Sequence, residues 1–320
     1  MVFSAKTQIK VSVCIPAFKR LDLLQRCLGS VLDQDFADFE VIITDDSPGR
    51  EIAEWLRGIS DRRIVYQHNQ PPLGAPENWN CAIRLASGEY IKVLHHDDYF
   101  ENNKALTMFV QALENNPQAD LAFSQMNIRF LKQQVFYRHK HTATQLKRLR
   151  DNADFLFFRN IIGNPSAVIF RNNRHLFFDP RYRWLVDVEL YIKILKKNPY
   201  FVVIPKPLVV SVDGEEGQIT GSVSDNAQVV ISESLRLFAG IRNDKILNSY
   251  KSSLYFQELF LRFGISSKSQ LESLVKLPAV LDTFIDEAFA GMNHNRLWKR
   301  LLKRILTSRY NKRFFKIERF

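Results

Sequence analysis

Cysteine is scarce in this sequence of 320 residues. Its three cysteines, Cys14, Cys27 and Cys81, lie far apart within apolar segments and form no C-x-x-C pair. Secreted domains that depend on disulfides have an even set of cysteines at short spacings, and this chain has no such set. The sequence therefore favours a reducing compartment, and we expect a cytoplasmic location.

Long apolar runs are also missing. No window reaches the roughly 18 apolar residues of a membrane-spanning helix, and the first residues, MVFSAKTQIKVSV, have no long apolar core after their lysine. We therefore expect a soluble or peripheral protein. Its composition, 46% apolar and 12% aromatic, is sufficient for a packed core in one large domain or two ordinary ones.

Glycine is absent from the turn after the first apolar run, residues 11–18. A dinucleotide site needs G-x-G-x-x-G at such a turn, so that a pyrophosphate can approach the backbone at a helix start. The chain has IPAFKRLD there, and it has no G-x-x-x-x-G-K-[ST] phosphate loop anywhere. A bound phosphate would therefore have to be neutralised in another way, and a divalent cation held by carboxylates does this well.

Predicted strands and helices alternate through the first hundred residues. Strands are expected over residues 11–18, 39–46, 64–69 and 90–94, with helices between them. The third of these helices has Pro76 at its start and Gly88 just past its end, as is typical of helix boundaries. The alternation predicts βαβ units, and hence an α/β fold with a Rossmann-like, mostly parallel sheet flanked by helices.

Acidic pairs follow two of the predicted strands. Asp45 and Asp46 end the second strand, and Asp97 and Asp98 come after the fourth. Ligands of parallel sheets bind beyond the carboxyl ends of the strands, so we expect the two pairs to converge on one crevice. Aspartate is also common in turns and helix caps, and for Asp45 that interpretation is equally good.

Several segments together resemble a known family. VSVCIPAFKR, FEVIITDDSP and LGAPENWNCAIRLASGEYIKVLHHDDYF resemble, in order and spacing, the nucleotide-sugar half of the family 2 glycosyltransferases, which have the GT-A fold. Farther along, FDPRYRWLVDVELYIKIL is similar to that family's acceptor-side segment. The resemblance covers roughly residues 9 to 210. It predicts a catalytic domain over residues 1–212, with a nucleotide-sugar half at 9–115 and an acceptor half at 116–212.

The resemblance implies roles for the donor-side residues. The end of the first strand, from Pro16 to Phe18, would border the nucleobase, with Phe18 offering an aromatic face. Asp46 would accept a hydrogen bond from the base, usually uracil or thymine. Asp97 and Asp98 would occupy the place of the family's D-x-D-type motif, Asp97 near the ribose or the metal and Asp98 as the direct ligand of Mg²⁺ or Mn²⁺.

The resemblance also implies a catalytic base. Asp187, in VDVEL, stands where inverting members have it, and Glu189 is a close rival two residues away. Two residues apart on one helix, the two carboxylates would point in different directions, so only one would face the acceptor. The implied reaction moves a sugar from a UDP- or dTDP-type donor to a hydroxyl of a saccharide or lipid-linked acceptor, with inversion, as in cell-surface polysaccharide synthesis.

Two positions depart from the family pattern. His95 stands where the family often has an acid, and Trp79 stands where many members have an arginine, ahead of the asparagine matched by Asn80. Arg20 is a candidate for the missing cation beside the diphosphate. Adjacent histidines on a strand point to opposite faces, so His95 and His96 could hardly both bind one zinc ion with the aspartates. Because of these departures, a non-catalytic nucleotide-sugar binding module remains an alternative. A sugar-phosphate nucleotidyltransferase ranks third, because such an enzyme should begin with a glycine-rich loop and IPAFKR contains no glycine.

The rest of the chain is expected to differ in character. The basic stretch from residue 138 to 150 is expected to be a loop, either a solvated surface strip or a segment that closes over the donor phosphates. The glycine-containing stretch 212–225 is expected to be a mobile loop or a boundary. Residues 213–320 are expected to be mainly helical. Within them, residues 296–320 contain ten Lys or Arg and one acid, and their apolar stripe is typical of a helix that lies on anionic lipid.

Such a tail would place the protein on the inner face of the membrane. The other interpretation is a helix docked on the domain with its charges in water. Nucleic acid is not an expected partner, because nothing in the sequence resembles a module that reads a groove.

Overall fold

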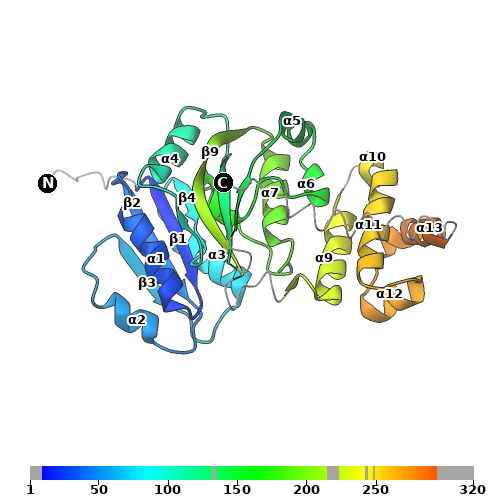
Figure 1. Ribbon diagram of the computed structural model, residues 1–320, viewed down its shortest axis with the longest axis horizontal. Coiled ribbons are helices and arrows are strands. Elements are labelled where there is room, and N and C mark those ends of the chain that lie inside the picture. The colour runs from blue at the N-terminus through cyan, green and yellow to red at the C-terminus, as the bar shows by residue number, and fades with distance from the viewer. Residues whose placement is uncertain (1–8, 132–134, 215–222, 242–243, 248, 294–320) are drawn as a thin grey trace. The chain divides into compact units, whose positions relative to one another are not determined.

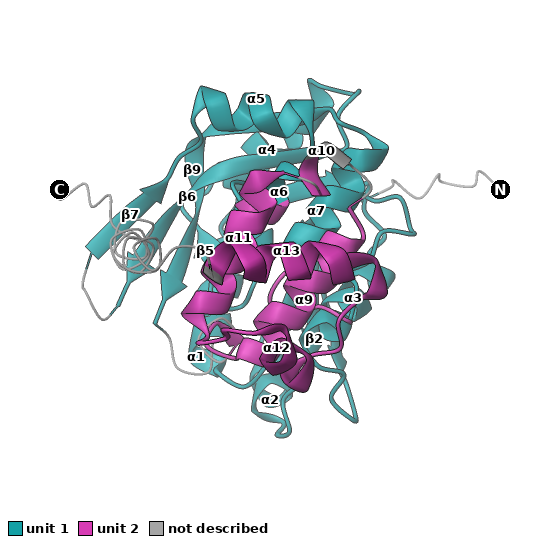
Figure 2. Ribbon diagram, turned by 90° about the vertical axis from the view of Figure 1, so that its right-hand side faces the viewer, with its two compact units in different colours: residues 1–156, 160–180, 186–215 teal, residues 157–159, 181–185, 216–320 magenta. Residues whose placement is uncertain are grey.

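The computed structural model describes residues 9–131, 135–214, 223–241, 244–247 and 249–293. The basic tail at 296–320 and part of the predicted boundary loop lie outside these residues. The chain divides into two compact units, the first comprising residues 1–156, 160–180 and 186–215 and the second residues 157–159, 181–185 and 216–320. Figure 2 colours the two units separately.

Four strands of the first unit form a parallel sheet. In spatial order they are β3 (Ile64–His68), β2 (Phe39–Asp45), β1 (Val11–Ala17) and β4 (Tyr90–Val93). Every residue of β1, β2 and β4 is buried, as expected for strands covered on both faces. The predicted βαβ alternation is confirmed, and β1 lies between the two strands that carry the acidic pairs.

The sheet continues beyond β4 in mixed orientation. The further strands are β8 (Val168–Arg171), β6 (Leu121–Phe130), β9 (Phe201–Asp213) and β5 (Tyr99–Phe100), and β7 (Val135–His139) forms a hairpin with β6. The pairings β4–β8 and β8–β6 are antiparallel, whereas β6–β9 is parallel. β9 contains Pro205 and Pro207, which cannot donate to a ladder, and its register with β6 shifts on both sides of Gln125.

Helices flank this sheet (Figure 1). They are α1 (Leu21–Leu32), α2 (Glu51–Leu56), α3 (Ala75–Leu85), α4 (Ala105–Glu114), α5 (Ala143–Asp151) and α7 (Val186–Lys197), with the short α6 (Phe155–Phe158) and the 3-10 turn Pro165–Ala167. The apolar stripe of α1, Leu24, Leu28 and Val31, is buried in one core with Phe109 of α4. Burial of such a face, rather than local propensity, supplies most of a helix's stability.

The basic stretch 138–150 is not the loop that we expected. Its first residues end β7, and from residue 143 it forms α5. The Thr142 hydroxyl accepts a hydrogen bond from the Gln145 amide, and the Gln145 side chain accepts one from the Thr142 amide. This reciprocal capping box satisfies two backbone donors at the helix start, which is why the helix begins there.

The second unit is helical over its described residues from 223 on, which confirms the expected helical C-terminal region. Its helices are α9 (Ala227–Ala239), α10 (Asp244–Leu247), α11 (Tyr250–Arg262), α12 (Lys268–Leu274) and α13 (Asp282–Asn293), with the 3-10 turn Ala279–Leu281. Phe238 and Phe256 are in edge contact at 5.0 Å between ring centroids, and Phe260 stacks on Phe289 at the same separation. Among the described residues no helix combines the length and apolarity needed to span a membrane.

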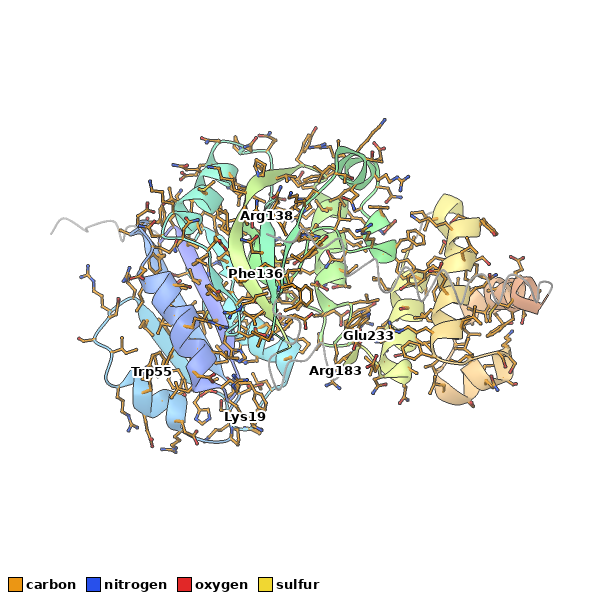
Figure 3. The ribbon with its side chains drawn as sticks, viewed as in Figure 1. Lys19, Trp55, Phe136, Arg138, Arg183 and Glu233 are labelled. Carbon is orange, nitrogen blue, oxygen red and sulfur yellow. The ribbon has the colours of Figure 1, made fainter. Side chains whose placement is uncertain are left out.

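One buried carboxylate orders the short segment 181–185 within the second unit. Glu233 of α9 accepts hydrogen bonds from the backbone amides of Arg183, Trp184 and Leu185 at 2.7–2.9 Å. Figure 3 shows Glu233 and Arg183 close together. Three amides that converge on one carboxylate offset the cost of its burial.

Candidate active site

The acidic sequence after β4 forms a tight turn at the carboxyl end of the sheet. The Leu94 amide still donates to Cys14 of β1, and the Asp98 amide then donates to the His95 carbonyl at 2.9 Å. Arg26 of α1 donates to the Asp97 carbonyl at 2.8 Å. The turn is therefore held from the sheet and from α1, and it presents its side chains beyond the strand end, where ligands of such sheets bind.

Three side chains of this turn come together. Single ligand-type atoms of His95, Asp97 and Asp98 all lie within 4.8 Å of one another. Asp98 is 1% exposed, and its Oδ2 accepts a hydrogen bond from Asn164 at 2.9 Å. His96 points elsewhere, since its Nδ1 lies 3.2 Å from the Pro16 carbonyl oxygen. The structure therefore separates the two histidines, and only His95 joins the aspartates.

The electrostatics of this cluster favour the binding of a cation. Burial, followed by the charge of Asp97, raises the pKa of Asp98 to about 7. Burial lowers the pKa of His95 to about 4, so its imidazole is neutral at pH 7. Two carboxylates and a neutral imidazole are suitable ligands for a divalent cation, which would relieve their repulsion. The residues present thus fit the metal that the sequence predicts.

A buried lysine lies behind the turn. Lys92 of β4 is fully buried, and its Nζ donates to the carbonyls of Val93 and Ser166. Burial lowers the pKa of Lys92 to about 7, while the nearby charge of Asp98 acts to raise it. The sequence analysis missed this residue because a strand of a parallel sheet is expected to be apolar throughout.

Asp187 lies in the first turn of α7, as predicted. Its Oδ2 accepts a hydrogen bond from Asn160 at 2.8 Å, and its Oδ1 accepts one from the Val188 amide at 2.8 Å. Burial raises the pKa of Asp187 to about 6, against the effect of these hydrogen bonds. Glu189 differs, because it forms an ion pair with Lys193 at 3.2 Å. A pKa of about 6 suits a general base that acts near neutral pH.

One short loop, which was not predicted from the sequence, contacts both the candidate base Asp187 and the candidate metal ligand Asp98. Asn160 binds Asp187, and Asn164, four residues later, binds Asp98 and the Ser211 hydroxyl. Between them Gly163 has φ +106°, a conformation that favours glycine. The Asn160 side chain also closes the loop through the amides of residues 162 and 163. Loop 160–164 thus holds the proposed base and the proposed metal ligand within one unit.

The predicted nucleobase residues lie at the ends of β1 and β2. Phe18 is 45% exposed, and the ammonium of Lys19, labelled in Figure 3, lies 5.0 Å from its ring. Asp46 is 4% exposed and accepts hydrogen bonds from Asn69 and from the amides of Leu73 and Gly74. A carboxylate can accept about four hydrogen bonds, so Asp46 retains limited capacity for a base. Its first task is to hold the segment that leads into α3.

Two other predicted donor residues already have partners. The Arg20 guanidinium donates to both carboxylate oxygens of Asp22, at 3.0 and 2.8 Å. Asn80 is 1% exposed, and its amide exchanges two hydrogen bonds of 2.8 Å with the backbone of Phe178. Arg20 would have to leave Asp22 to reach a diphosphate, and Asn80 would support the site rather than line it. Their contacts with the donor therefore stay predictions.

The two departures from the family pattern contact one another. The rings of Trp79 and His95 lie 4.6 Å apart between centroids, and Phe178 meets Trp79 edge-on at 5.0 Å. Trp79 is thus packed between α3 and the acidic turn. Changes at two separate sequence positions form one aromatic contact, which sequence alone could not reveal because the positions are 16 residues apart.

Known proteins resemble this chain in sequence. It matches the family model "Glycosyl transferase family 2" over residues 12–195. WcaA of Escherichia coli, a putative colanic acid biosynthesis glycosyl transferase, is 26% identical over 215 residues, which is 66% of this chain and 76% of that protein. WfaP of Escherichia coli, a UDP-Glc:alpha-D-GlcNAc-diphosphoundecaprenol beta-1,3-glucosyltransferase, is 35% identical over 94 residues, 29% of this chain and 38% of that protein.

Most of these matches are partial. The alignment with the Mycobacterium tuberculosis protein MT1568 spans 62% of that protein's length, and the one with WfaP spans still less. The whole-protein activities of these relatives therefore come to this chain only as proposals.

Solved structures are similar in fold. TarS 1-349 of S. aureus in complex with UDP-GlcNAc has a TM-score of 0.57 at 19% identity, covering 79% of this chain and 71% of that one. The Pyrobaculum calidifontis mannosyltransferase PcManGT in complex with GDP-Man and Mn²⁺ has a TM-score of 0.59 at 16% identity, covering 96% and 87%. These likenesses confirm the predicted GT-A fold. Since the family model matches more than half of the chain, this protein belongs to glycosyl transferase family 2.

Proposed function

We propose that this glycosyltransferase moves a sugar from a UDP- or dTDP-type donor to a hydroxyl of a saccharide or lipid-linked acceptor, with inversion and with the help of a divalent cation. The observation that carries the proposal is loop 160–164, which holds a buried carboxylate with a pKa of about 6 and a metal-type carboxylate at once. A base and a charge-neutralising site are the two functions that this transfer needs.

In the reaction the bond from the anomeric carbon to the diphosphate oxygen breaks, and a bond to the acceptor oxygen forms. Asp187 accepts the proton of the attacking hydroxyl, and attack of that oxygen on the face opposite the leaving group gives inversion. A divalent cation, when bound by Asp97 and Asp98, supplies Lewis-acid stabilisation of the diphosphate. Phe18 offers its exposed ring to the nucleobase, and Asp46 keeps the adjacent backbone in place.

Separate substitution of Asp187 and Glu189 tests which of them is the catalytic base. We expect Asp187→Asn to lower kcat by on the order of a hundredfold or more while donor binding stays near normal, because the base acts only on the acceptor. Glu189→Gln, which removes an ion-paired acid from the same helix, is the matched control and should leave kcat within about threefold. A large loss in Glu189→Gln with activity retained in Asp187→Asn would reverse the assignment.

The pH profile gives a second measurement on the same residue. Only ionised Asp187 accepts a proton, so kcat should fall about tenfold per unit below pH 6 and level off above it. No turnover of the wild type with a broad panel of nucleotide sugars, despite donor binding by thermal shift, would instead favour the non-catalytic binding module.

Peripheral membrane association is the remaining part of the proposal. WfaP is named for a diphosphoundecaprenol-linked acceptor, and a similar acceptor here would bring the protein to a bilayer. The basic tail at 296–320 is the segment proposed to meet anionic lipid. Deletion of this tail should reduce sedimentation with anionic vesicles but not with neutral ones, and unchanged binding would rule the tail out.

A further inference from the structure

The imidazole of His95 lies against the acidic pair Asp97 and Asp98. Its Nε2 is buried and has no hydrogen-bond partner among the residues that the structure describes. The ligand-type atoms of Asp97, Asp98 and this histidine lie within 4.8 Å of one another. A buried ring nitrogen without a partner is costly unless something binds it, and the neighbouring carboxylates indicate that a cation does.

The backbone and the ring of His95 are both held in place. The His95 amide donates to the Ser166 hydroxyl at 3.0 Å, and its carbonyl accepts from the Asp98 amide. Trp79 covers the imidazole at 4.6 Å between ring centroids. A ligand that is fixed before the metal arrives loses little freedom on binding, which raises affinity.

We propose that His95 is a nitrogen ligand of the metal in this site, so that the enzyme selects a transition-metal ion such as Mn²⁺ or Co²⁺ over Mg²⁺. Mg²⁺ prefers oxygen ligands and releases water reluctantly, whereas imidazole suits first-row transition metals. The inference rests on the proposed function only in that Asp97 and Asp98 hold the same cation.

The test measures metal binding to the full chain without substrates. Mn²⁺ is added to the protein, and pulsed electron paramagnetic resonance is used to detect hyperfine coupling to a directly bound ¹⁴N nucleus. We expect this coupling in the wild type and its loss in His95→Phe, which keeps a ring against Trp79 but removes both nitrogens. His96→Gln is the matched control, because the His96 ring is bonded to a backbone carbonyl instead, and it should retain the coupling.

Affinity provides an independent readout. Titration of Co²⁺, followed by its visible absorption, should show at least about a tenfold loss of affinity in His95→Phe, since even the partners of metal ligands are worth ten- to a hundredfold. His95→Asp replaces a nitrogen ligand with an oxygen ligand. The preference for Co²⁺ over Mg²⁺, measured as the ratio of their dissociation constants, should therefore decrease. This variant also keeps the proposal testable if His95→Phe does not fold.

Three outcomes would overturn the inference: Mn²⁺ that binds the wild type without nitrogen coupling, coupling that persists in His95→Phe, or an unchanged selectivity in His95→Asp. None of these would affect the proposed transfer reaction, which an all-oxygen site could equally support. Failure of the reaction would be seen separately, as absence of turnover by a wild type that binds both donor and metal.

Discussion

Two pairs of aspartates follow strands of the same parallel sheet, and their surroundings differ. Asp45 accepts hydrogen bonds from the Ser47 amide and the Tyr66 hydroxyl, and Asp46 accepts three more from residues 69–74. Asp97 and Asp98 lie against each other and against His95, and the pKa of Asp98 is raised to about 7. Asp98 also accepts hydrogen bonds from Asn164, Ser166 and Ser211, yet burial and the charge of Asp97 still raise its pKa, so these donors offset the cost of its charge only in part.

The surroundings of the carboxylates, rather than the sequence, distinguish an acidic pair that fixes a loop from one that can bind a cation. Both pairs have the same sequence signature, a buried strand that ends in two acids. Hydrogen bonds donated to a carboxylate stabilise its ionised form in the folded protein, and they fix the loops that carry the donors. Carboxylates that repel one another need a cation from outside, so the repulsion itself indicates the ligand.

The largest expected effect is a difference in catalytic activity between variants of the two acidic pairs. Asp98→Asn should lower kcat/KM by on the order of a hundred- to a thousandfold, because charge stabilisation of the leaving group is lost. Asp46→Asn should lower it far less and should instead lower the free energy of unfolding by about 1–3 kcal/mol, because an amide replaces one acceptor oxygen. Steady-state kinetics and denaturant unfolding of both variants check this. Equal loss of activity in the two variants would contradict the comparison.

The pH dependence of stability gives the next effect, and it concerns Asp98 of the second pair. The pKa of Asp98 is raised in the folded state, so its contribution to stability is present below its unfolded pKa and is lost as pH rises through about 7. Asp98→Asn should therefore stabilise the metal-free protein at pH 8, by on the order of 2 kcal/mol, and have little effect near pH 4.

Asp46→Asn is the control for this measurement, since it should destabilise the protein at pH 8. Thermal unfolding in the presence of a chelator measures both variants. If Asp98→Asn is no more stable than the wild type at pH 8, then the donors around Asp98 compensate its charge after all. The addition of Mn²⁺ should reverse the order, because only the wild type gains the stability of metal binding.

Much of the sheet could be predicted from sequence because it depends on strong local patterns. Short buried strands and the stripe of Leu24, Leu28 and Val31 fix the order of elements, and acids at strand ends fix the edge that binds ligands. The strand β9 was not predicted, because Pro205 and Pro207 argue against a ladder, and only the register shift at Gln125 makes room for them.

The support of the site could not be predicted in the same way. Asn160, Gly163 and Asn164 are typical of any turn, and nothing local indicates that their side chains reach Asp187 and Asp98. The contact between Trp79 and His95 likewise exists only after the fold has formed. One missed element did have a local signal, since the Thr142-x-x-Gln145 box announces the start of α5.

The smallest expected effects come from the two asparagines of loop 160–164, which hydrogen-bond to Asp98 and Asp187. Asn164→Ala removes a hydrogen bond to Asp98 that favours its ionised form, so the pKa of Asp98 should rise further and metal affinity at pH 7 should fall about threefold to tenfold. Asn160→Ala removes the corresponding bond to Asp187 and should move the acid limb of the kcat profile to higher pH without changing metal affinity. Because the two asparagines belong to one loop, each variant is the control for general damage to it. If both variants changed metal affinity and the kcat profile alike, the loop would act as one rigid support, and the two side chains would have no separate roles.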